Sequence, residues 1–241
     1  MFDYNKPIFD SARISYWHGQ GYTGKGIGIA VLDTKHKAYY FQDAFEPIQP
    51  LFDTYGHSTG VIGVLREVCP GATIYSLPYI ADGKTKQASL EWLIANKDKI
   101  DLINCSFSSP FTTIDFPKIK DLGIPIISAS GNDGKEDQIS LPARFDYTLA
   151  VGAWMHSTDS SPKYSNAGAE LDLVAYTNVM YKTDWGGTTF TGTSGAAPVA
   201  TGMLALYLEW RKKNKLRELD PEEIREFVQN NTIDKYDEGH D

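Results

Sequence analysis

Cysteine is scarce in this sequence of 241 residues, which contains only Cys69 and Cys105. Two cysteines form at most one disulfide, so the chain is not a scaffold built on a disulfide framework. They do not form a C-x-x-C pair, and a zinc site with the usual ligand spacing is therefore not expected. We predict two buried thiols, no bound metal and no organic cofactor.

The chain also lacks a long apolar run and an excess of basic residues. Its most apolar stretch, residues 195–208, is shorter than the roughly 20 residues that a helix needs to cross a membrane. The formal net charge is -8, which argues against nucleic acids and anionic membranes as partners. The first residues have neither the basic nor the apolar region of a secretory signal. We expect a cytoplasmic monomer, or a secreted protein if a precursor segment has been removed.

Apolar, β-rich runs alternate with helical patterns along the chain. Alternation at this spacing is typical of βαβ units, and it predicts an α/β fold with a mostly parallel central sheet in a single domain over residues 1–241. No linker or internal repeat interrupts the pattern. The predicted strands cover residues 27–32, 73–77, 101–105, 125–129 and 147–153, and the predicted helices cover residues 86–95, 116–122, 193–210 and 221–230.

Polar side chains of four suitable types stand where predicted strands end or predicted helices begin. Asp33 follows the first strand, and Asn132 follows the fourth. His57 precedes an apolar stretch that should continue a helix, and Ser194 opens the longest helix. Because sites in parallel sheets form at the carboxyl ends of strands, we expect these four side chains to meet.

These four residue types are the ones that acyl transfer requires. A serine hydroxyl is a weak nucleophile at neutral pH, and His57 could take its proton. The carboxylate of Asp33 could hold the imidazole in the correct tautomer and stabilise it when it is charged. The amide of Asn132 and the main-chain N–H of Ser194 could bind the oxyanion of a tetrahedral intermediate. Taken singly, each of these residues is more often a turn, cap or surface residue.

The sequence around these residues resembles the subtilisin-like serine protease family. The order Asp, His, Ser is the subtilisin order. The matching segments are GYTGKGIGIAVLDT, GHSTGVIGVL, INCSFSS, IISASGNDG, LPARFDYTLAVGA, SNAGAELDLVA and GTSGAAPVATGMLAL, in the family's order over roughly residues 15–232. The resemblance implies a three-layer fold with helices on both faces of the sheet. It also implies a serine endopeptidase whose partner is a protein or peptide substrate.

The resemblance implies a substrate cleft as well. The substrate peptide would pair with the segment after the third predicted strand. Its P1 side chain, on the amino side of the cleaved bond, would enter a pocket with Asp133 at the rim. This acidity favours a basic P1 residue, unless the carboxylate is merely solvated. The implied substrate-binding residues are Ser106, Phe107, Ser108, Ser109, Ser130, Gly131, Asp133 and Ser140.

Two departures from the family stand out. Gly195 follows Ser194, where the family usually has methionine or another bulky residue. Ser108 and Ser109 stand where glycines are common, and their Cβ atoms could narrow the cleft. Two alternatives to hydrolysis stay open. In a peptide ligase or macrocyclase an amine would intercept the same acyl-enzyme, although the capping insertion of such relatives is missing. A pseudoprotease would bind peptides without cutting them, although such relatives usually lose a triad member.

Overall fold

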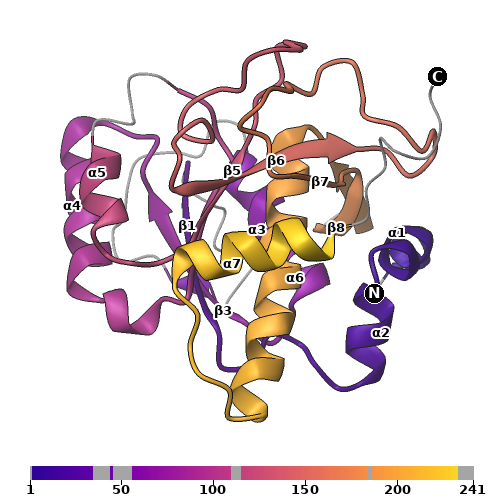
Figure 1. Cartoon of the computed structure of the whole chain (residues 1–241), viewed down its shortest axis with the longest axis horizontal. Helices are drawn as coiled ribbons and strands as arrows, with labels where there is room; N and C mark the ends of the chain where they lie inside the picture. The colour runs from indigo at the N-terminus through magenta and orange to yellow at the C-terminus, as the bar shows by residue number, and fades with distance from the viewer. Residues whose placement is uncertain (1, 35–43, 46–55, 110–114, 184–185, 233–241) are drawn as a thin grey trace.

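The computed structural model describes residues 2–34, 44–45, 56–109, 115–183 and 186–232. This part of the chain forms a seven-stranded parallel sheet with the strand order β2-β3-β1-β4-β5-β6-β7 (Figure 1). A separate antiparallel hairpin joins β8 to β9. The strands are β1 (Gly28–Asp33), β2 (Ala44–Phe45), β3 (Thr73–Pro78), β4 (Leu102–Cys105), β5 (Ile126–Ala129), β6 (Thr148–Trp154), β7 (Leu173–Tyr176), β8 (Val179–Thr183) and β9 (Gly186–Phe190).

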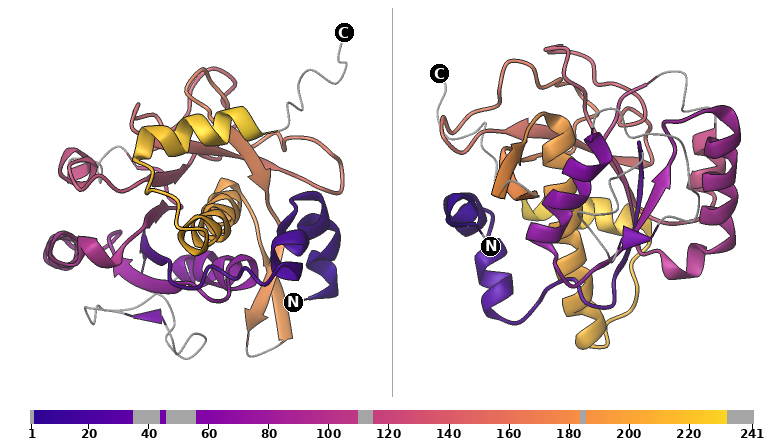
Figure 2. Two further views of the ribbon diagram at one scale, coloured as in Figure 1. Left: turned by 60° about the horizontal axis from the view of Figure 1, so that its bottom comes forward. Right: turned by 180° about the vertical axis from the view of Figure 1, so that it is seen from behind.

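Helices cover both faces of the sheet, which confirms the predicted three-layer α/β fold. Helices α4 and α5 lie on one side, and α3 and α6 lie on the other (Figure 2). The C-terminal helix α7 packs on α6. The helices are α1 (Lys6–Ser11), α2 (Ile14–Gly19), α3 (His57–Val68), α4 (Gly83–Ala95), α5 (Phe116–Lys120), α6 (Thr193–Lys213) and α7 (Pro221–Asn231).

The central strand β1 shows why both faces must be covered. Ile29 and Val31 belong to the hydrophobic core under α3 and α6. Ala30 and Leu32 belong to the core under α4 and α5. Successive side chains of a strand point to opposite faces, so a strand that is apolar at every position needs a helix layer on each side.

Local capping fixes the helix starts more sharply than hydrophobic periodicity does. Helix α4 begins three residues before its predicted start because Asp82 caps it, accepting the N–H groups of Lys84 and Thr85 at 3.0 Å each. Helix α7 begins at the predicted residue, Pro221. Its N-cap Asp220 forms a capping box with Glu223.

A buried carboxylate on α6 fixes the loop that leads into β1. The Oε2 atom of Glu209 accepts the N–H groups of Thr23 and Gly24 at 2.7 Å each and that of Lys25 at 3.1 Å. Its Oε1 atom lies 2.7 Å from Nζ of Lys213. Burial alone would raise the pKa of Glu209, but the hydrogen bonds from Lys213 and from the loop lower it below its usual value. The loop is therefore tied to the helix that carries Ser194.

Candidate active site

Asp33 and His57 form a hydrogen-bonded pair at the carboxyl end of the sheet. Asp33 is the last residue of β1 and is fully buried, and His57 is the first residue of α3. Nδ1 of His57 lies 2.8 Å from Oδ1 of Asp33. The same oxygen accepts the N–H of Thr34 at 2.7 Å and its hydroxyl at 3.2 Å. The carboxylate is thus held in one orientation, and it orients the imidazole.

The aromatic ring of Phe190 covers one side of this pair. Phe190 ends β9, and its ring meets the imidazole of His57 edge-on, with ring centroids 5.3 Å apart and an interplanar angle of 73°. A Cβ atom on Gly60, one turn into α3, would lie 2.4 Å from this ring. The glycine therefore allows the hairpin to approach the helix that presents His57.

Ser194 is the second residue of α6, and its side chain lies near the same edge of the sheet. Helices α3 and α6 pack directly on each other, and a Cβ on Gly202 would meet the side chain of Val68 at 2.5 Å. Both helices begin at the carboxyl ends of the strands, with His57 in the first position of one and Ser194 in the second position of the other. Ser194 is 8% exposed, so its surroundings leave only a narrow access to solvent.

Asn132 is anchored to the start of α6 beside Ser194. Its Oδ1 atom accepts the N–H of Thr193 at 2.9 Å and the hydroxyl of Thr193 at 3.0 Å. In the first turn of α6, the carbonyl of Gly192 accepts the N–H groups of Gly195 at 3.0 Å and Ala196 at 3.3 Å.

Two donors at the start of α6 have no acceptor among the described residues. One is the N–H of Ser194, which its position in the first helical turn leaves unpaired. The other is the exposed amide nitrogen of Asn132, because the oxygen of that amide already accepts from Thr193. Two fixed donors at a helix N-terminus can bind a developing negative charge.

Comparison with known proteins identifies the family. The sequence profile of the Subtilase family, Peptidase_S8, matches residues 54–241. The chain belongs to the subtilase family. Subtilisin E of Bacillus subtilis (strain 168) is 31% identical over 222 residues, which cover 79% of this chain and 58% of that protein. The chain therefore spans less than two thirds of the length of this relative.

Two further relatives extend the likeness. The major intracellular serine protease of Bacillus subtilis (strain 168) is 28% identical over 247 residues, which cover 85% of this chain and 75% of that protein. The crystal structure of a lanthipeptide protease has a TM-score of 0.76 at 19% identity, over 97% of this chain and 89% of that chain. The second comparison shows the subtilase fold alone.

Asn166, a fully buried asparagine that the sequence analysis does not single out, bonds residues that the resemblance assigns to substrate binding. Its Oδ1 atom accepts the N–H groups of Asp133 at 2.9 Å and Lys135 at 3.0 Å. Its Nδ2 atom donates to Ser140 Oγ and Asp133 Oδ2, both at 3.2 Å. Asn166 therefore joins the loop after Asn132 to Ser140, which the resemblance places in the P1 pocket.

Gly131 and Ser130 contact the same group of residues. Gly131 has φ +107°, and a Cβ at this position would lie 2.5 Å from the hydroxyl of Ser140. Only glycine suits both the backbone conformation and the close approach. The hydroxyl of Ser130 is buried and donates to the carbonyl of Asn166 at 2.9 Å. The Ser130 hydroxyl is therefore used inside the protein and is not offered to a ligand.

The segment after β4 begins with Ser106 and Phe107, whose side chains contact other residues of the protein. Ser106 is fully buried, and its Oγ accepts from Nδ2 of Asn104 at 2.9 Å. Phe107 stacks on Tyr79, with ring centroids 5.9 Å apart. The side chains of Ser106 and Phe107 are therefore both engaged within the protein.

Ser108 and Ser109 lie further along the same segment. Ser108 is exposed, and Ser109 is half-buried. The N–H of Ser109 donates to the carbonyl of Leu141 at 2.9 Å, which joins this segment to the residue after Ser140.

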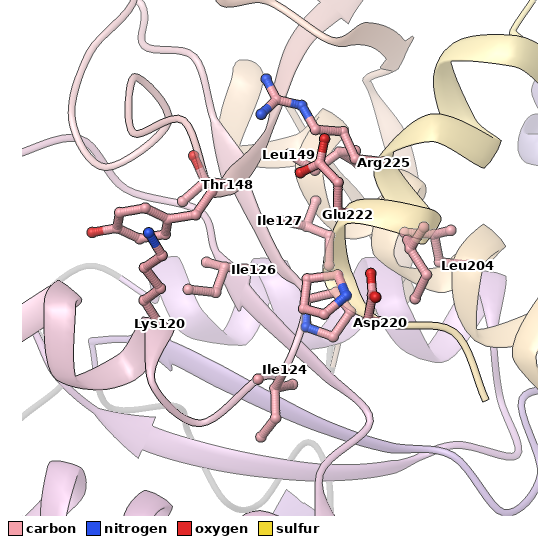
Figure 3. Close-up of a pocket in the computed structure, with 15 residues that line it drawn as sticks. Lys120, Ile124, Ile126, Ile127, Thr148, Leu149, Leu204, Asp220, Glu222 and Arg225 are labelled. Atoms are coloured by element: carbon pink, nitrogen blue, oxygen red, sulfur yellow. The ribbon is translucent and has the colours of Figure 1, made fainter.

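A cavity of about 360 Å³ lies at the other edge of the sheet, where β5 and β6 begin (Figure 3). Its floor is apolar, and Lys120, Asp220, Glu222 and Arg225 stand around it. It opens at the amino ends of the strands, whereas the Asp33–His57 pair lies at the carboxyl ends, so it is not part of the cleft.

The described residues contain neither a membrane-spanning helix nor a metal-binding cluster. Among the described residues, no helix is long and apolar enough to cross a membrane. In the same ranges, no three His, Cys, Asp or Glu side chains gather as a metal site would require.

Proposed function

We propose that this chain is a serine endopeptidase that hydrolyses peptide bonds through an acyl-enzyme. Ser194 is the nucleophile, His57 the general acid and base, and Asp33 the carboxylate that orients His57. The observation that carries the proposal is the pair of unengaged donors, Asn132 Nδ2 and Ser194 N–H, fixed beside a serine at a helix start. The chain spans 58% of the length of Subtilisin E. The proposal therefore concerns the activity of this chain alone.

Each reaction step follows from these positions. Ser194 Oγ attacks the peptide carbonyl carbon while Nε2 of His57 takes the hydroxyl proton. The carbonyl oxygen becomes an oxyanion that accepts hydrogen bonds from Asn132 and from the N–H of Ser194. The C–N bond then breaks, and His57 gives its proton to the leaving amine. Water, deprotonated by His57, attacks the ester and releases the carboxylate product together with the Ser194 hydroxyl.

The test is covalent labelling with a fluorophosphonate probe, followed by intact mass and peptide mapping. We expect one label per folded molecule on Ser194. Labelling should be abolished in Ser194→Ala and strongly reduced in His57→Ala. Product masses from a cleaved peptide separate hydrolysis, which adds one water, from ligation, which does not. A folded sample that neither labels nor cleaves would contradict the proposal.

We further propose that the pocket prefers a basic P1 residue. Asp133 is exposed, and one oxygen of its carboxylate is held by Nδ2 of Asn166 at 3.2 Å, which directs the group instead of leaving it to rotate freely. Opposite charges across a binding surface favour association. A panel of peptides with Arg, Leu and Glu at P1 tests this, with Asp133→Asn as the matched variant. Equal cleavage of all three by the wild type would refute the preference.

The name of the major intracellular serine protease supports a location inside the cell for this chain too. Fractionation of the source cells with an antibody to the chain tests it. Recovery from the culture medium would contradict it.

A further inference from the structure

A fully buried asparagine joins the N-terminal helices to the β8–β9 hairpin. The side chain of Asn5 binds both main-chain groups of Met180 in β8. Its Oδ1 accepts the N–H of Met180 at 2.8 Å, and its Nδ2 donates to the carbonyl of Met180 at 2.8 Å. Asn5 thus makes the two hydrogen bonds that a neighbouring strand would make at this point.

The hairpin depends on such outside contacts for its position. Its two strands pair only with each other, and they do not join the seven-stranded sheet of the described residues. A two-stranded hairpin by itself is marginally stable in water. The N-terminal segment also covers its second strand, because a Cβ at Gly187 would lie 3.0 Å from the ring of Phe2. The hairpin is therefore held between this segment and helix α3.

The end of the hairpin where β8 begins and β9 ends lies at the active site. Val179, next to Met180, pairs with Phe190. The ring of Phe190 contacts the imidazole of His57, and its carbonyl lies against Gly195, the residue after the proposed nucleophile. A shift of the hairpin would change the surroundings of His57 and Ser194 at the same time.

We propose that Asn5 is a positioning residue for the catalytic pair, which acts by holding the β8–β9 hairpin so that Phe190 stays packed against His57. Asn5 itself touches neither the substrate nor the reacting atoms. The proposal rests on the proposed serine endopeptidase function. Asn5 lies 175 residues from Met180 in the sequence. According to the proposal, the N-terminal segment therefore influences the rate of acylation.

The experiment compares Asn5→Ala, Phe190→Leu and the double variant with the wild type. The measured quantity is the second-order rate constant of fluorophosphonate labelling per folded molecule, at a temperature where circular dichroism shows every variant folded. Asn96→Ala is the matched control. The side chain of Asn96 also donates to a main-chain carbonyl, that of Trp92, at 2.9 Å. Asn96 is the C-cap of α4, which lies on the opposite face of the sheet from α3 (Figure 2). Asn5→Ser, with a shorter donor and acceptor, replaces Asn5→Ala if that variant does not fold.

We expect Asn5→Ala to label about 10-fold more slowly than the wild type, because small displacements of catalytic groups are costly. Asn96→Ala should label at the wild-type rate. The double variant should be slower than Phe190→Leu alone by much less than 10-fold, since both changes act through one contact. Equal rates for Asn5→Ala and Asn96→Ala, or additive effects in the double variant, would overturn the proposal.

A second measurement separates this proposal from the proposed function. Because an aromatic ring shifts the proton NMR signals of a group packed against it, we expect the His57 imidazole signals to report on the contact with Phe190. The NMR measurement does not require an active enzyme. If Asn5→Ala moves the His57 signals toward their positions in Phe190→Leu while the wild type fails to label, the contact is as proposed and the endopeptidase function is wrong. If the wild type labels and the His57 signals of Asn5→Ala stay in place, the function stands and the role of Asn5 is refuted.

Discussion

The Cβ atom that any other residue would carry at Gly195 would lie 2.7 Å from the carbonyl oxygen of Phe190. It would also lie 2.9 Å from the hydroxyl of Thr177, which donates to the carbonyl of Gly192. Real Cβ atoms do not approach backbone oxygens so closely. The hairpin strand β9 therefore occupies the space that a bulky residue after the proposed nucleophile would need.

This relationship predicts the effect of Gly195→Ala. The added methyl group must push β9 away or displace the start of α6, and overpacking of this kind costs about 1–3 kcal/mol. We expect a lower free energy of unfolding and slower fluorophosphonate labelling of Ser194. Urea unfolding and labelling rates measure the two effects.

Gly83→Ala is the matched control for that variant. Gly83 is the first residue of α4, and no atom lies within 4 Å of a Cβ placed there. The change should leave the labelling rate unaltered and raise the stability slightly, because alanine loses less backbone entropy on folding than glycine does. A Gly195→Ala protein as stable and as reactive as Gly83→Ala would show that the hairpin yields without cost.

Asn132 provides a second prediction. Asn132→Ala removes one of the two unengaged donors beside Ser194 and leaves the Asp33–His57 pair intact. We expect kcat to fall by about 10²–10³ with little change in KM, the size known for the oxyanion-hole asparagine of subtilisin, whose role we propose for Asn132. Steady-state kinetics on a cleaved peptide measure it. A rise in KM at unchanged kcat would instead assign Asn132 to ground-state binding.

Thr193→Val tests how that asparagine is held. The variant deletes the hydroxyl that donates to Asn132 Oδ1 at 3.0 Å but keeps the N–H donor at 2.9 Å. Because one of two anchoring bonds survives, its loss of kcat should be smaller than that of Asn132→Ala. The hydroxyl of Thr193 also accepts the N–H of Gly131 at 3.3 Å. A loss as large as that of Asn132→Ala would mean that the N–H bond alone does not hold Asn132 in place.

The two cysteines provide a fourth prediction. Burial raises the pKa of the Cys69 thiol to about 12. Burial, followed by the nearby charge of Asp33, raises the pKa of Cys105. The thiolate is the reactive form, so neither thiol should be alkylated by iodoacetamide in the folded protein, and both should react in denaturant. Alkylation of either cysteine in folded protein would show that its element opens.

The sequence predicts the central part of the fold and site because local signals place it. Asp33 and Ser194 stand at the end of an apolar strand and the start of a long apolar helix, and the structure begins and ends both elements within three residues of the predicted bounds. His57 precedes an apolar stretch, and α3 begins at His57 itself.

Long-range contacts define what the sequence does not predict. Asn5 finds its partner 175 residues away, and Asn166 bonds the loop after Asn132 across more than 30 residues. Helices α1 and α2 and the strands β7, β8 and β9 were not expected either. Strand β9, with the sequence GGTTF, lacks an apolar alternation, and its place depends on packing against α3 and the N-terminal segment. No local pattern marks such residues.

Glu209 provides a prediction on stability against pH. Hydrogen bonds hold its pKa below the usual value of 4.5, so its ionised form stabilises the fold at neutral pH. Glu209→Gln should lower the free energy of unfolding by about 1.5–3 kcal/mol at pH 7, the usual worth of a hydrogen bond to a charged group. Both proteins should carry Ser194→Ala, which prevents self-digestion during urea unfolding.

The sign of the pH effect follows from the direction of the shift. A group whose pKa is lowered by folding contributes stability above its unfolded pKa and loses it as the pH falls through the folded pKa. The difference between the two proteins should therefore shrink as the pH falls below 4.5, because glutamine does not titrate. Glu67 is the control of opposite sign, since burial raises its pKa despite hydrogen bonds from Phe2 and Asn5. Glu67→Gln should gain stability relative to the wild type as the pH rises above 4.5, and parallel pH curves for the two variants would refute both assignments.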